Sequence, residues 1–503
     1  MSGHLTILPV LLPFATGVLL LLVPGRSLKL QRAIGVTGVL LLLAVAAALL
    51  AASTQGGARV YHLGDWPAPF GIVLVLDRLS ALMLALTAAI ALLSLLQAVQ
   101  GRDTAGPLFH PLFQLQLVGL NGAFLTGDLF NLFVFFEILL IASYCLLVYG
   151  STAPRLRAGV HYVVLNLAGS SLFLIAVGTL YGLTGTLNMA DMARKVVTVP
   201  VADVPLLHAA ALLLLIVFAL KAAVAPLYFW LPAAYAAASA PVAALFAIMT
   251  KVGVYAIVRV YTLVFGPAAD PALGFVATEW LLPIALATIL LGMLGAVGVR
   301  ELRRMQGYLL IGSIGIMLAP IALFSAGGIS AGLYYLVHST IVMAAMFLLS
   351  DLIAKQRGGK DDLLVQGPAV MQAGSLGLLF FIGAVTVAGL PPFSGFVGKA
   401  LILSAAQPAP AMPWIWSFVV LSGLLAIAAL SRAGIIVFWD ADAEEEAVAV
   451  RWRLLELGPA IALLALVVGI TALAGPITLF LDGTAQQLLA PGEYVRAVLG
   501  GMP

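Results

Sequence analysis

The sequence predicts an all-α polytopic membrane protein with about fourteen transmembrane helices. The chain has 503 residues, of which 63% are hydrophobic and only 9% are charged. Apolar windows of about 20 residues recur along it, and each is long enough to cross a hydrocarbon core about 30 Å thick. In two of these windows a lysine stands beside helix-breaking prolines. This composition excludes a water-soluble globular fold and favours a single integral membrane domain over residues 1–503.

Hydrophobic length and periodicity place the spans in chain order. The first apolar run lacks a basic leading segment and a convincing cleavage site, so we expect it to be retained as a span, although it could also serve as an insertion signal. Residues 1–104 would form a three-helix N-terminal segment, and residues 441–503 the last helix and a short tail. The predicted spans cover roughly residues 4–24, 30–52, 77–99, 108–127, 129–149, 157–183, 205–231, 238–265, 276–298, 305–325, 329–353, 372–404, 414–438 and 457–480.

Basic residues are distributed unequally between alternate connections, and this indicates the orientation. The odd-numbered connections hold fourteen lysines and arginines, whereas the even-numbered connections and the tail hold five. The odd connections are therefore predicted to be cytoplasmic, and both termini to face outward. The fourteen are Arg26, Lys29, Arg32, Arg102, Arg155, Arg157, Arg300, Arg303, Arg304, Lys355, Arg357, Lys360, Arg451 and Arg453; the five are Arg59, Arg78, Arg194, Lys195 and Arg496.

Two connections are long enough to carry structure of their own. Residues 183–205 include LNMADMARKVV, which could form a short interfacial helix. The acidic run DADAEEE, from Asp440 to Glu446, is interpreted as a solvated cytoplasmic surface, with docking of a partner as the alternative. About twenty residues follow the last predicted span, too few for a long lateral extension.

The stretch from Leu206 to Val242 begins as an uninterrupted apolar helix and then places Lys221 inside the span. Pro226 follows five residues later, and Pro232 comes after it. A lysine in hydrocarbon costs about 2.5–3.5 kcal/mol on insertion scales, and a proline removes a helical hydrogen bond. Both are tolerated together where the broken backbone lines protein or water. The alternative is a lysine that snorkels and a proline that only kinks the helix.

A second stretch, AGLPPFSGFVGK, repeats this combination in the twelfth span. Pro391, Pro392 and Gly395 are helix-breaking residues, and Lys399 follows in the same apolar run. Two interrupted spans in corresponding halves of a chain are typical of an internally repeated transporter with its site at the breaks. Spans 7 and 12 are therefore predicted to be broken helices.

The fifth span carries one acidic residue, Glu137, about eight residues from its outer end. At 1.5 Å per residue it would lie roughly 12 Å deep, near the middle of the membrane. An isolated carboxylate there would take up a proton, whereas a neighbouring lysine would hold it charged. Lys221 is the preferred partner, and a purely structural ion pair is the alternative to a role in proton translocation.

The eighth span contains Lys251, Tyr255 and Arg259 at intervals of four residues, so the three share one helix face. Lys251 lies centrally and is predicted to take part in proton translocation. Arg259 lies nearer the outer end and is expected to snorkel to the membrane surface.

The eleventh span contains His338, with Tyr334 one turn before it and Ser339 beside it. An unperturbed imidazole has a pKa of about 6.5, which suits proton exchange near neutral pH. We expect His338 to act as a proton relay, and a hydrogen-bonded core histidine is the alternative. His161 and His208 lie near span ends and are weaker candidates.

Together these groups predict a stepwise proton path. Three of the seven lysines, Lys221, Lys251 and Lys399, lie deep within spans. Burial disfavours the charged form of a lysine and a nearby carboxylate favours it, so moving the counter-charge would switch a lysine between holding and releasing a proton. Water would bridge the gaps between these lysines and His338.

The sequence shows no sign of enzymatic chemistry. It has no P-loop, no zinc-ligand spacing and no convincing nucleophile motif. Its only cysteine, Cys145, can form neither an internal disulfide nor a cysteine-ligated iron–sulfur cluster. We therefore expect a secondary transporter with no catalytic residue, cofactor or metal.

These residues resemble the charged axis of the antiporter-like, proton-pumping subunits of respiratory complex I and their relatives. Those subunits carry a glutamate in span 5 and lysines in the broken span 7, in span 8 and in the broken span 12, which match Glu137, Lys221, Lys251 and Lys399, with His338 in span 11. The resemblance covers roughly spans 2–14. Within this superfamily, GDLFNLFVFFEILLIASYCLLVYG and LPPFSGFVGKALIL are similar to the D-type subunits of Mrp-type multisubunit cation/proton antiporters.

The resemblance implies two inverted five-helix repeats, spans 4–8 over residues 105–266 and spans 9–13 over residues 274–440, with half-channels that meet on a polar central axis. It also implies an obligate hetero-oligomer in the cell membrane that exchanges cytoplasmic sodium or another monovalent cation for external protons, without a nucleic-acid partner. This subunit would carry mainly protons. Which cation is exchanged, whether it passes through this subunit, the stoichiometry and the partner subunits stay open.

Two other functions also stay open. A membrane-arm subunit of NADH:quinone oxidoreductase, with every redox centre on other chains, would use the same charged axis. The lack of a long C-terminal extension separates the chain from the larger A-type antiporter subunits and their complex I counterpart, and Lys399 separates it from the complex I class with a glutamate there. An unrelated carrier or flippase would need a large substrate cavity and would leave the two lysines at the breaks unexplained.

Overall fold

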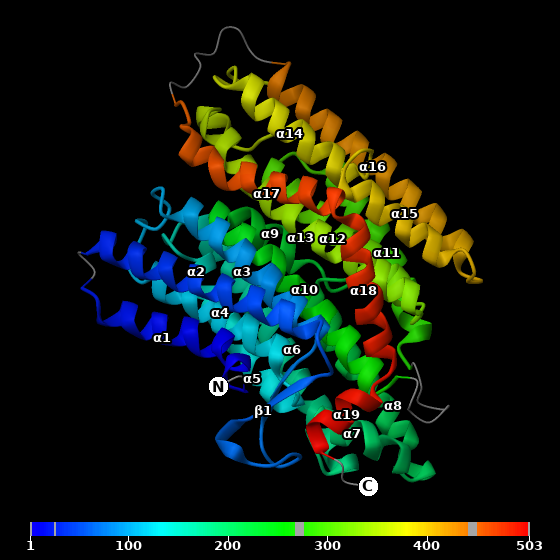
Figure 1. Cartoon of the computed structure of the whole chain (residues 1–503). Coiled ribbons are helices and arrows are strands. Elements are labelled where there is room, and N and C mark those ends of the chain that lie inside the picture. Colours follow the sequence, from blue (N-terminus) through cyan, green and yellow to red (C-terminus); the bar gives the residue numbers. More distant parts are fainter. Residues whose placement is uncertain (1–2, 25–26, 267–275, 441–449, 501–503) are drawn as a thin grey trace.

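The computed structural model describes residues 3–24, 27–266, 276–440 and 450–500. Over these residues the chain forms nineteen α-helices and one two-stranded antiparallel sheet. Figure 1 shows the long helices side by side in one bundle, with the N-terminal helices on one flank and α14, α15 and α16 on the opposite flank. The predicted all-helical, polytopic class is confirmed, apart from the small sheet.

Eleven helices in the described part of the chain are long and apolar enough to cross a membrane. Leucine, alanine, isoleucine and valine dominate them, and in hydrocarbon a helix satisfies all of its backbone hydrogen bonds internally. They are α2 (Leu28–Ser53), α3 (Arg78–Ala98), α5 (Leu129–Leu147), α6 (Ala153–Thr184), α8 (Val204–Ala222, preceded by a 3-10 turn), α10 (Ala240–Leu263), α11 (Thr278–Gly298), α12 (Leu302–Ile321), α13 (Ala326–Lys355), α16 (Met412–Phe438) and α17 (Leu454–Ala472).

Eight shorter helices complete the set. Three of them, α1 (Leu8–Leu22), α14 (Ala373–Ala388) and α15 (Ser394–Ala406), are apolar. The other five are α4 (Phe109–Leu125), α7 (Met189–Lys195), α9 (Trp230–Ala237), α18 (Ala474–Leu489) and α19 (Gly492–Leu499). Helix α7 is the short helix expected within residues 183–205, where Asn188 accepts hydrogen bonds from the backbone N–H groups of Ala190 and Asp191.

Both predicted interruptions are present, but one residue assigned to them lies elsewhere. Helix α8 ends at Ala222 and α9 begins at Trp230, so Pro226 lies in the gap. Helix α14 ends at Ala388 and α15 begins at Ser394, which leaves both prolines of the second pair between them. Gly395 was expected at this break and instead lies in the first turn of α15. The residue that ends α14 is Gly389, whose φ of 80° is the left-handed conformation that favours glycine.

The prolines at the breaks are exposed on the surface of the single chain, although the interrupted backbone was expected to line protein or water. Pro226, Pro391 and Pro392 are all exposed, whereas Lys221 and Lys399 beside them are buried. Each break therefore turns a lysine inward while its prolines stay at the surface.

Alternate connections gather at opposite ends of the bundle. At one end, called here the hairpin end, β1 (Arg59–His62) pairs with β2 (Val73–Leu76), and single bridges join Leu74 to Thr126 and Asp128 to Asn188. Helices α7 and α19 lie at the same end (Figure 1). At the other end, called here the cavity end, Arg32 pairs with Asp103 and Arg102 with Asp351.

Helices α10 and α13 form the centre of the bundle. Every side chain of α10 is buried, as is every residue of α13 from Gly328 to Ala354. Helix α10 packs against α3, α8 and α13. Small residues allow this close approach, since a Cβ on Gly253 would lie 2.4 Å from the backbone nitrogen of Ala222 in α8.

The C-terminal part of the chain differs from the expectation. One span was predicted over residues 457–480, but the helix ends at Ala472 and a second helix starts at Ala474, so that α18 and α19 cover most of the predicted tail. The β1–β2 hairpin was also not expected. Residues 441–446 of the acidic run lie outside the described residues.

Candidate functional site

Glu137 and Lys221 are joined through a third residue rather than by a direct ion pair. Ser170 of α6 donates a hydrogen bond through Oγ to the Glu137 carboxylate on α5. Lys221 Nζ, on α8, lies 3.5 Å from the same Ser170 Oγ. Among the described residues no Glu137–Lys221 ion pair is formed within 4.0 Å. The predicted partnership is therefore close in space but mediated by a hydroxyl.

Asn166 completes the surroundings of Lys221. Lys221 Nζ lies 3.5 Å from both the backbone oxygen and the side-chain Oδ1 of Asn166, and 5.9 Å from the centre of the Phe136 ring. The lysine is only 5% exposed. The sequence analysis did not name Asn166 and Ser170. Their separation by one helical turn within a single span could have indicated a polar patch on one face of that helix.

Lys251 lies at the centre of the molecule and is fully buried. The hydrogen bond that the structure gives its Nζ is a long one of 3.4 Å to Thr250 Oγ1. On the neighbouring α4, Gln116 contacts Met249 through Nε2, and its Oε1 is buried with no partner among the described residues. Lys251 is therefore a buried amine with few hydrogen-bond partners to offset the cost of its burial. Such a costly group is typical of a functional site in a membrane protein.

Arg259 does not snorkel, and that prediction was wrong. Its side chain is 4% exposed, and its guanidinium makes a two-point ion pair with Asp77, with Nη1–Oδ2 and Nη2–Oδ1 distances of 2.6 and 2.8 Å. Asp77 also caps α3 in a capping box with Ser80. A buried carboxylate opposite the arginine removes the reason for its side chain to reach the membrane surface.

The second break brings His338 and Lys399 to one place. His338 Nδ1, on α13, lies 2.9 Å from Ser394 Oγ at the start of α15. Lys399 Nζ donates to the backbone oxygen of Ala388, the last residue of α14, over 2.9 Å. Ser394 was missed, whereas Tyr334 and Ser339, named as neighbours of His338, hydrogen-bond to backbone oxygens of Ile470 and Leu336.

The five predicted proton-path residues thus form two clusters and a link. The first cluster holds Glu137 and Lys221, the second holds His338 and Lys399, and Lys251 lies on α10, which packs against both α8 and α13. In the described part of the chain no group of three or more histidine, cysteine, aspartate or glutamate side chains could hold a metal ion.

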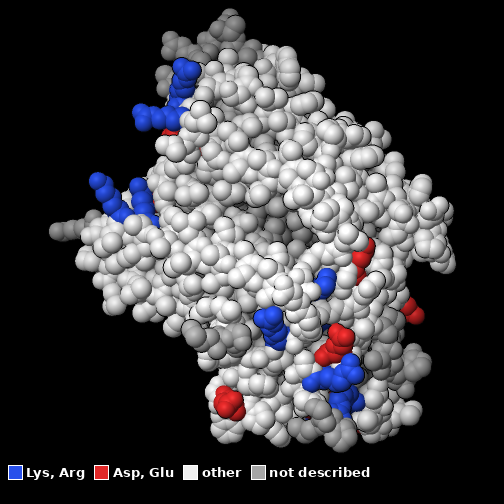
Figure 2. Space-filling model, in the orientation of Figure 1, with Lys and Arg blue, Asp and Glu red and all other residues white. Residues whose placement is uncertain are grey.

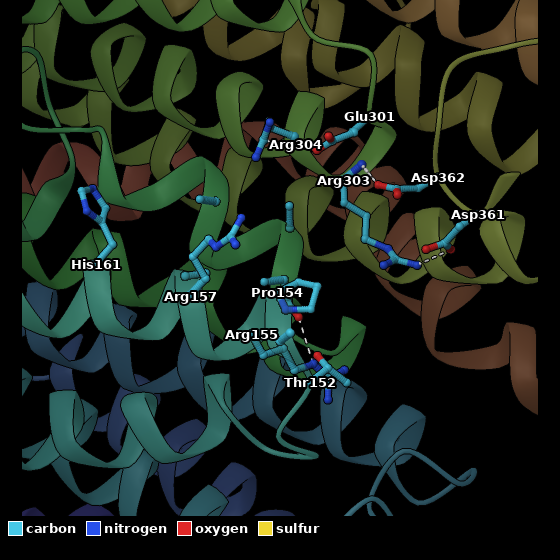
Figure 3. Close-up of a pocket in the computed structure, with 15 residues that line it drawn as sticks. Thr152, Pro154, Arg155, Arg157, His161, Glu301, Arg303, Arg304, Asp361 and Asp362 are labelled. Carbon is cyan, nitrogen blue, oxygen red and sulfur yellow. Dashed lines mark hydrogen bonds and ion pairs between the residues drawn. The ribbon is translucent and has the colours of Figure 1, made fainter. Parts of the chain in front are cut away.

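His161 lies apart from these clusters. It lines a cavity of about 870 Å³ at the cavity end, between α6, α9, the start of α12 and the connection that follows α13. Figure 3 shows Arg155, Arg157, Arg303 and Arg304 around the same space, where Arg303 pairs with Asp361 over 3.0 Å and Arg304 with Glu301 over 3.2 Å. The sequence analysis did not predict this cavity, because its charged residues come from the start of α6, the start of α12 and the connection after α13, which lie far apart in the chain.

Comparison with known proteins agrees with this geometry. Residues 126–428 match the family model described as NADH:quinone oxidoreductase/Mrp antiporter, and this stretch includes all five path residues and both breaks. The chain belongs to this family. The predicted resemblance is confirmed.

Individual members of the family match over nearly the whole chain. The D-type subunit of a probable K+/H+ antiporter of Rhizobium meliloti is 43% identical over 99% of this chain and 97% of its own. The D-type subunit of the Na+/H+ antiporter of Alkalihalophilus pseudofirmus is 40% identical over 99% of both chains. A chain in the structure of the Mrp complex from Dietzia sp. superimposes with a TM-score of 0.88 at 29% identity, over 99% of both chains.

Proposed function

We propose that this chain is the proton-translocating subunit of a multisubunit antiporter that exchanges a monovalent cation for protons. The observation that carries the proposal is Lys251, fully buried on the central helix α10 between two broken helices that each carry a buried lysine. The relatives named as D-type subunits of Na+/H+ and K+/H+ antiporters support sodium or potassium as the exchanged cation. The chain would act as a secondary transporter component without catalytic chemistry of its own.

Protons would move along Glu137, Lys221, Lys251, His338 and Lys399. When the Glu137 carboxylate lies close to Lys221, it favours the ammonium form, and when it moves away the buried lysine releases its proton. Ser170 can take part in this step because its hydroxyl faces both groups. The proton would pass next to Lys251 and then to His338 and Lys399, with water between groups that do not touch.

The proposed architecture has fourteen spans in two inverted repeats. The eleven long helices would be joined by α1, α4 and the broken pair α14–α15, with α9 completing the seventh span. The two repeat units would cover residues 105–266 and 274–440. The contacts of Lys221 in the first unit and of the α14–α15 break in the second support this division. In the first unit Lys221 contacts α6, the third helix of that unit, and in the second the α14–α15 break contacts α13, also the third helix, through Ser394 and His338.

The chain would work inside an obligate hetero-oligomer in the cell membrane, with the hairpin end and both termini outside. The known Mrp complex structure supports partner subunits. Apolar side chains at the breaks add to this, because Phe229, Leu390 and Phe396 are 62%, 40% and 45% exposed on the single chain. Lipid or a neighbouring protein chain would cover them in the membrane.

The proposal is tested by expressing the chain alone and with its partner subunits in antiporter-deficient vesicles. We expect sodium- or potassium-driven pH changes only from the assembled complex, and none after Lys251→Ala. Lys195→Ala is the matched control, since that lysine is 40% exposed on α7. Exchange by the lone chain would refute the obligate complex, and normal exchange by assembled Lys251→Ala complexes would refute the proposed path.

The second candidate is a proton-pumping membrane-arm subunit of a redox complex. The family model covers NADH:quinone oxidoreductase as well as Mrp antiporters. Purification of the native complex separates the two functions, because the redox candidate requires partner subunits that carry flavin or iron–sulfur centres.

A further inference from the structure

A buried charged cluster at the hairpin end has no role in the path described so far. Asp77 and Arg259 form its two-point ion pair, with exposed side-chain fractions of only 2% and 4%. The guanidinium also lies over the rings of Tyr255 and Tyr494, at 5.4 and 5.2 Å from their centres. Tyr255 OH lies 3.3 Å from Arg259 Nε and donates to the backbone oxygen of Phe124 over 2.7 Å.

The cluster lies on the same face of α10 as Lys251. Lys251, Tyr255 and Arg259 follow one another at four-residue intervals, so the ion pair lies about 12 Å along the helix from the buried amine. Tyr255, buried between them, carries a hydroxyl that can donate and accept. Polar groups therefore extend from the centre of the molecule to its hairpin end along one helix.

The C-terminal helix separates these polar groups of α10 from solvent. Helix α19 packs against α7 and β1 and buries Tyr494, Val498 and Leu499. Beneath it lies a cavity of about 10 Å³, roughly the space of one water molecule. Its lining includes Asp77, Arg259, Thr262, Gln487 and Tyr494. The preceding α18 is held to the start of α3, because Gln487 Oε1 accepts from the backbone N–H of Arg78.

A buried ion pair is a poor source of stability, since desolvation offsets much of its attraction. While it is paired with Arg259, the Asp77 carboxylate stays ionised, and it can exchange a proton with water in the adjoining cavity once it separates from the arginine. Its charged and titratable neighbours are Arg259, Tyr255 and Tyr494, which come from α10 and α19.

We propose that the Asp77–Arg259 pair beneath Tyr494 is the port through which Lys251 exchanges protons with water at the hairpin end, with α19 as its lid. This rests on the proposed function. When α19 lifts, the Asp77 carboxylate separates from Arg259, which keeps its own protons, and then takes a proton from water. Asp77 then passes the proton to water beside Tyr255. The Tyr255 hydroxyl turns away from the Phe124 oxygen, accepts this proton and gives its own, through water, to the neutral Lys251 amine. The sum is one proton moved from solvent to Lys251.

The lid is tested by cysteine accessibility in the assembled complex, with Cys145→Ser as the background. Thr262→Cys places a thiol in the lining of the port, and Ala256→Cys places one on the same helix away from it. We expect an impermeant cationic thiosulfonate, added from the hairpin end, to label Thr262→Cys slowly, and at least ten times faster when Tyr494→Ala is added. Tyr494→Phe should keep the slow rate, because the ring stays. Ala256→Cys should not respond to either change, and an equal rate for Thr262→Cys with and without Tyr494→Ala would overturn the lid.

The proton role is tested by transport in the same assembled complexes. We expect Asp77→Asn to slow antiport at least tenfold. Asp103→Asn, which breaks an aspartate–arginine pair at the cavity end with a buried aspartate and a half-buried arginine, should keep near-normal exchange. If Lys251→Ala is inactive while Asp77→Asn exchanges normally, the port is wrong and the proposed function stands. If Lys251→Ala is active, the proposed function itself fails.

Discussion

Ser170 decides how Glu137 and Lys221 act on each other. Its hydroxyl donates to the carboxylate and lies 3.5 Å from the ammonium nitrogen. A hydroxyl in this position can take a proton from the lysine as it gives its own to the glutamate, so the pair can exchange a proton without touching. The same group also limits direct charge attraction, because it keeps the two side chains apart.

Ser170→Ala should therefore slow antiport by about tenfold or more. A positioned proton-transfer group typically raises the rate by about 10²–10⁴-fold. The loss should be smaller here, because a water molecule would replace part of the function of the missing hydroxyl. Ser171→Ala is the matched control, since that serine is exposed on the same helix and donates only to its own backbone turn. The measurement is cation-driven dissipation of a pH gradient in vesicles. Equal rates for the two variants, in complexes assembled to the same extent, would show that the hydroxyl has no part in transfer.

Lys221→Arg separates a proton relay from a scaffold. Arginine keeps the positive charge but does not release its proton in proteins, so exchange should be poor even though the charge survives. Lys221→Ala and Glu137→Ala should abolish antiport, and Glu137→Asp should retain some of it. Vesicle transport is measured with assembly checked on native gels. Near-normal exchange by assembled Lys221→Arg complexes would mean that Lys221 need not deprotonate.

At the scale of helices, the two breaks place their lysines differently. Lys221 lies in the last turn of α8, before its break, and points to the side chains of α6. Lys399 lies in α15, after its break, and reaches back to the last backbone oxygen of α14. Helix C-termini leave backbone oxygens without partners and attract positive charge, so the second lysine also caps the helix that precedes it.

An ion pair joins the half-buried Arg32 of α2 to the buried Asp103 in the connection before α4, and it should make the stability of the fold depend on pH. Burial alone would raise the pKa of Asp103, but hydrogen bonds from Arg32 and His110 outweigh it and lower the pKa from 3.8 to about 2. Because the pKa is lower in the folded state, the contribution is complete above about pH 4 and is lost as the pH falls toward 2. Asp103→Asn should remove about 2 kcal/mol at neutral pH.

The measurement is the apparent unfolding temperature of the detergent-solubilised complex between pH 7 and pH 2.5. The parent should lose stability below about pH 4, and Asp103→Asn should start lower and show a weaker dependence in that range. Asp203→Asn, at an exposed position, should follow the parent. Parallel curves for the parent and Asp103→Asn would show that the acid dependence of stability does not come from Asp103.

At the scale of the whole molecule, charge and burial divide the chain into two ends and a middle. Figure 2 shows lysine, arginine, aspartate and glutamate gathered toward opposite parts of the visible face, with a broad uncharged band between them. Lys221, Lys251, His338 and Lys399 of the predicted path are buried on α10, on α13 and on helices that pack against these two, whereas Glu137 on α5 is half-buried. An uncharged belt around a buried polar axis suits a protein that conducts ions through a bilayer.

The predicted orientation places Asp440 in the cytoplasm and Glu493 outside. Single cysteines at these two exposed positions, in a Cys145→Ser background, should react with an impermeant thiol reagent from opposite sides of the membrane. Glu493 lies on α19 at the hairpin end, so its labelling also tells which solvent the proposed port faces. Reaction of both cysteines from the same side would contradict the fourteen-span topology.

Sequence alone predicted the membrane class and the two breaks, and it supplied the residues of the proposed path. This was possible because each of these features costs free energy wherever it lies in hydrocarbon. A lysine or glutamate inside an apolar span, or a proline in its middle, needs a compensating partner whatever the fold. Such residues therefore stand out before any contact is known.

The tertiary structure decided the partners, because a partner need not be unusual in its own span. Ser170, Asn166 and Ser394 are neutral residues at ordinary places in helices, and they matter only because another helix brings a charged group to them. Arg259 was predicted wrongly for the same reason. Whether an arginine near a helix end snorkels or stays buried depends on what lies opposite, and here it is Asp77, 182 residues earlier in the chain. No local pattern records a contact over that separation, which exists only once α3 and α10 are packed together.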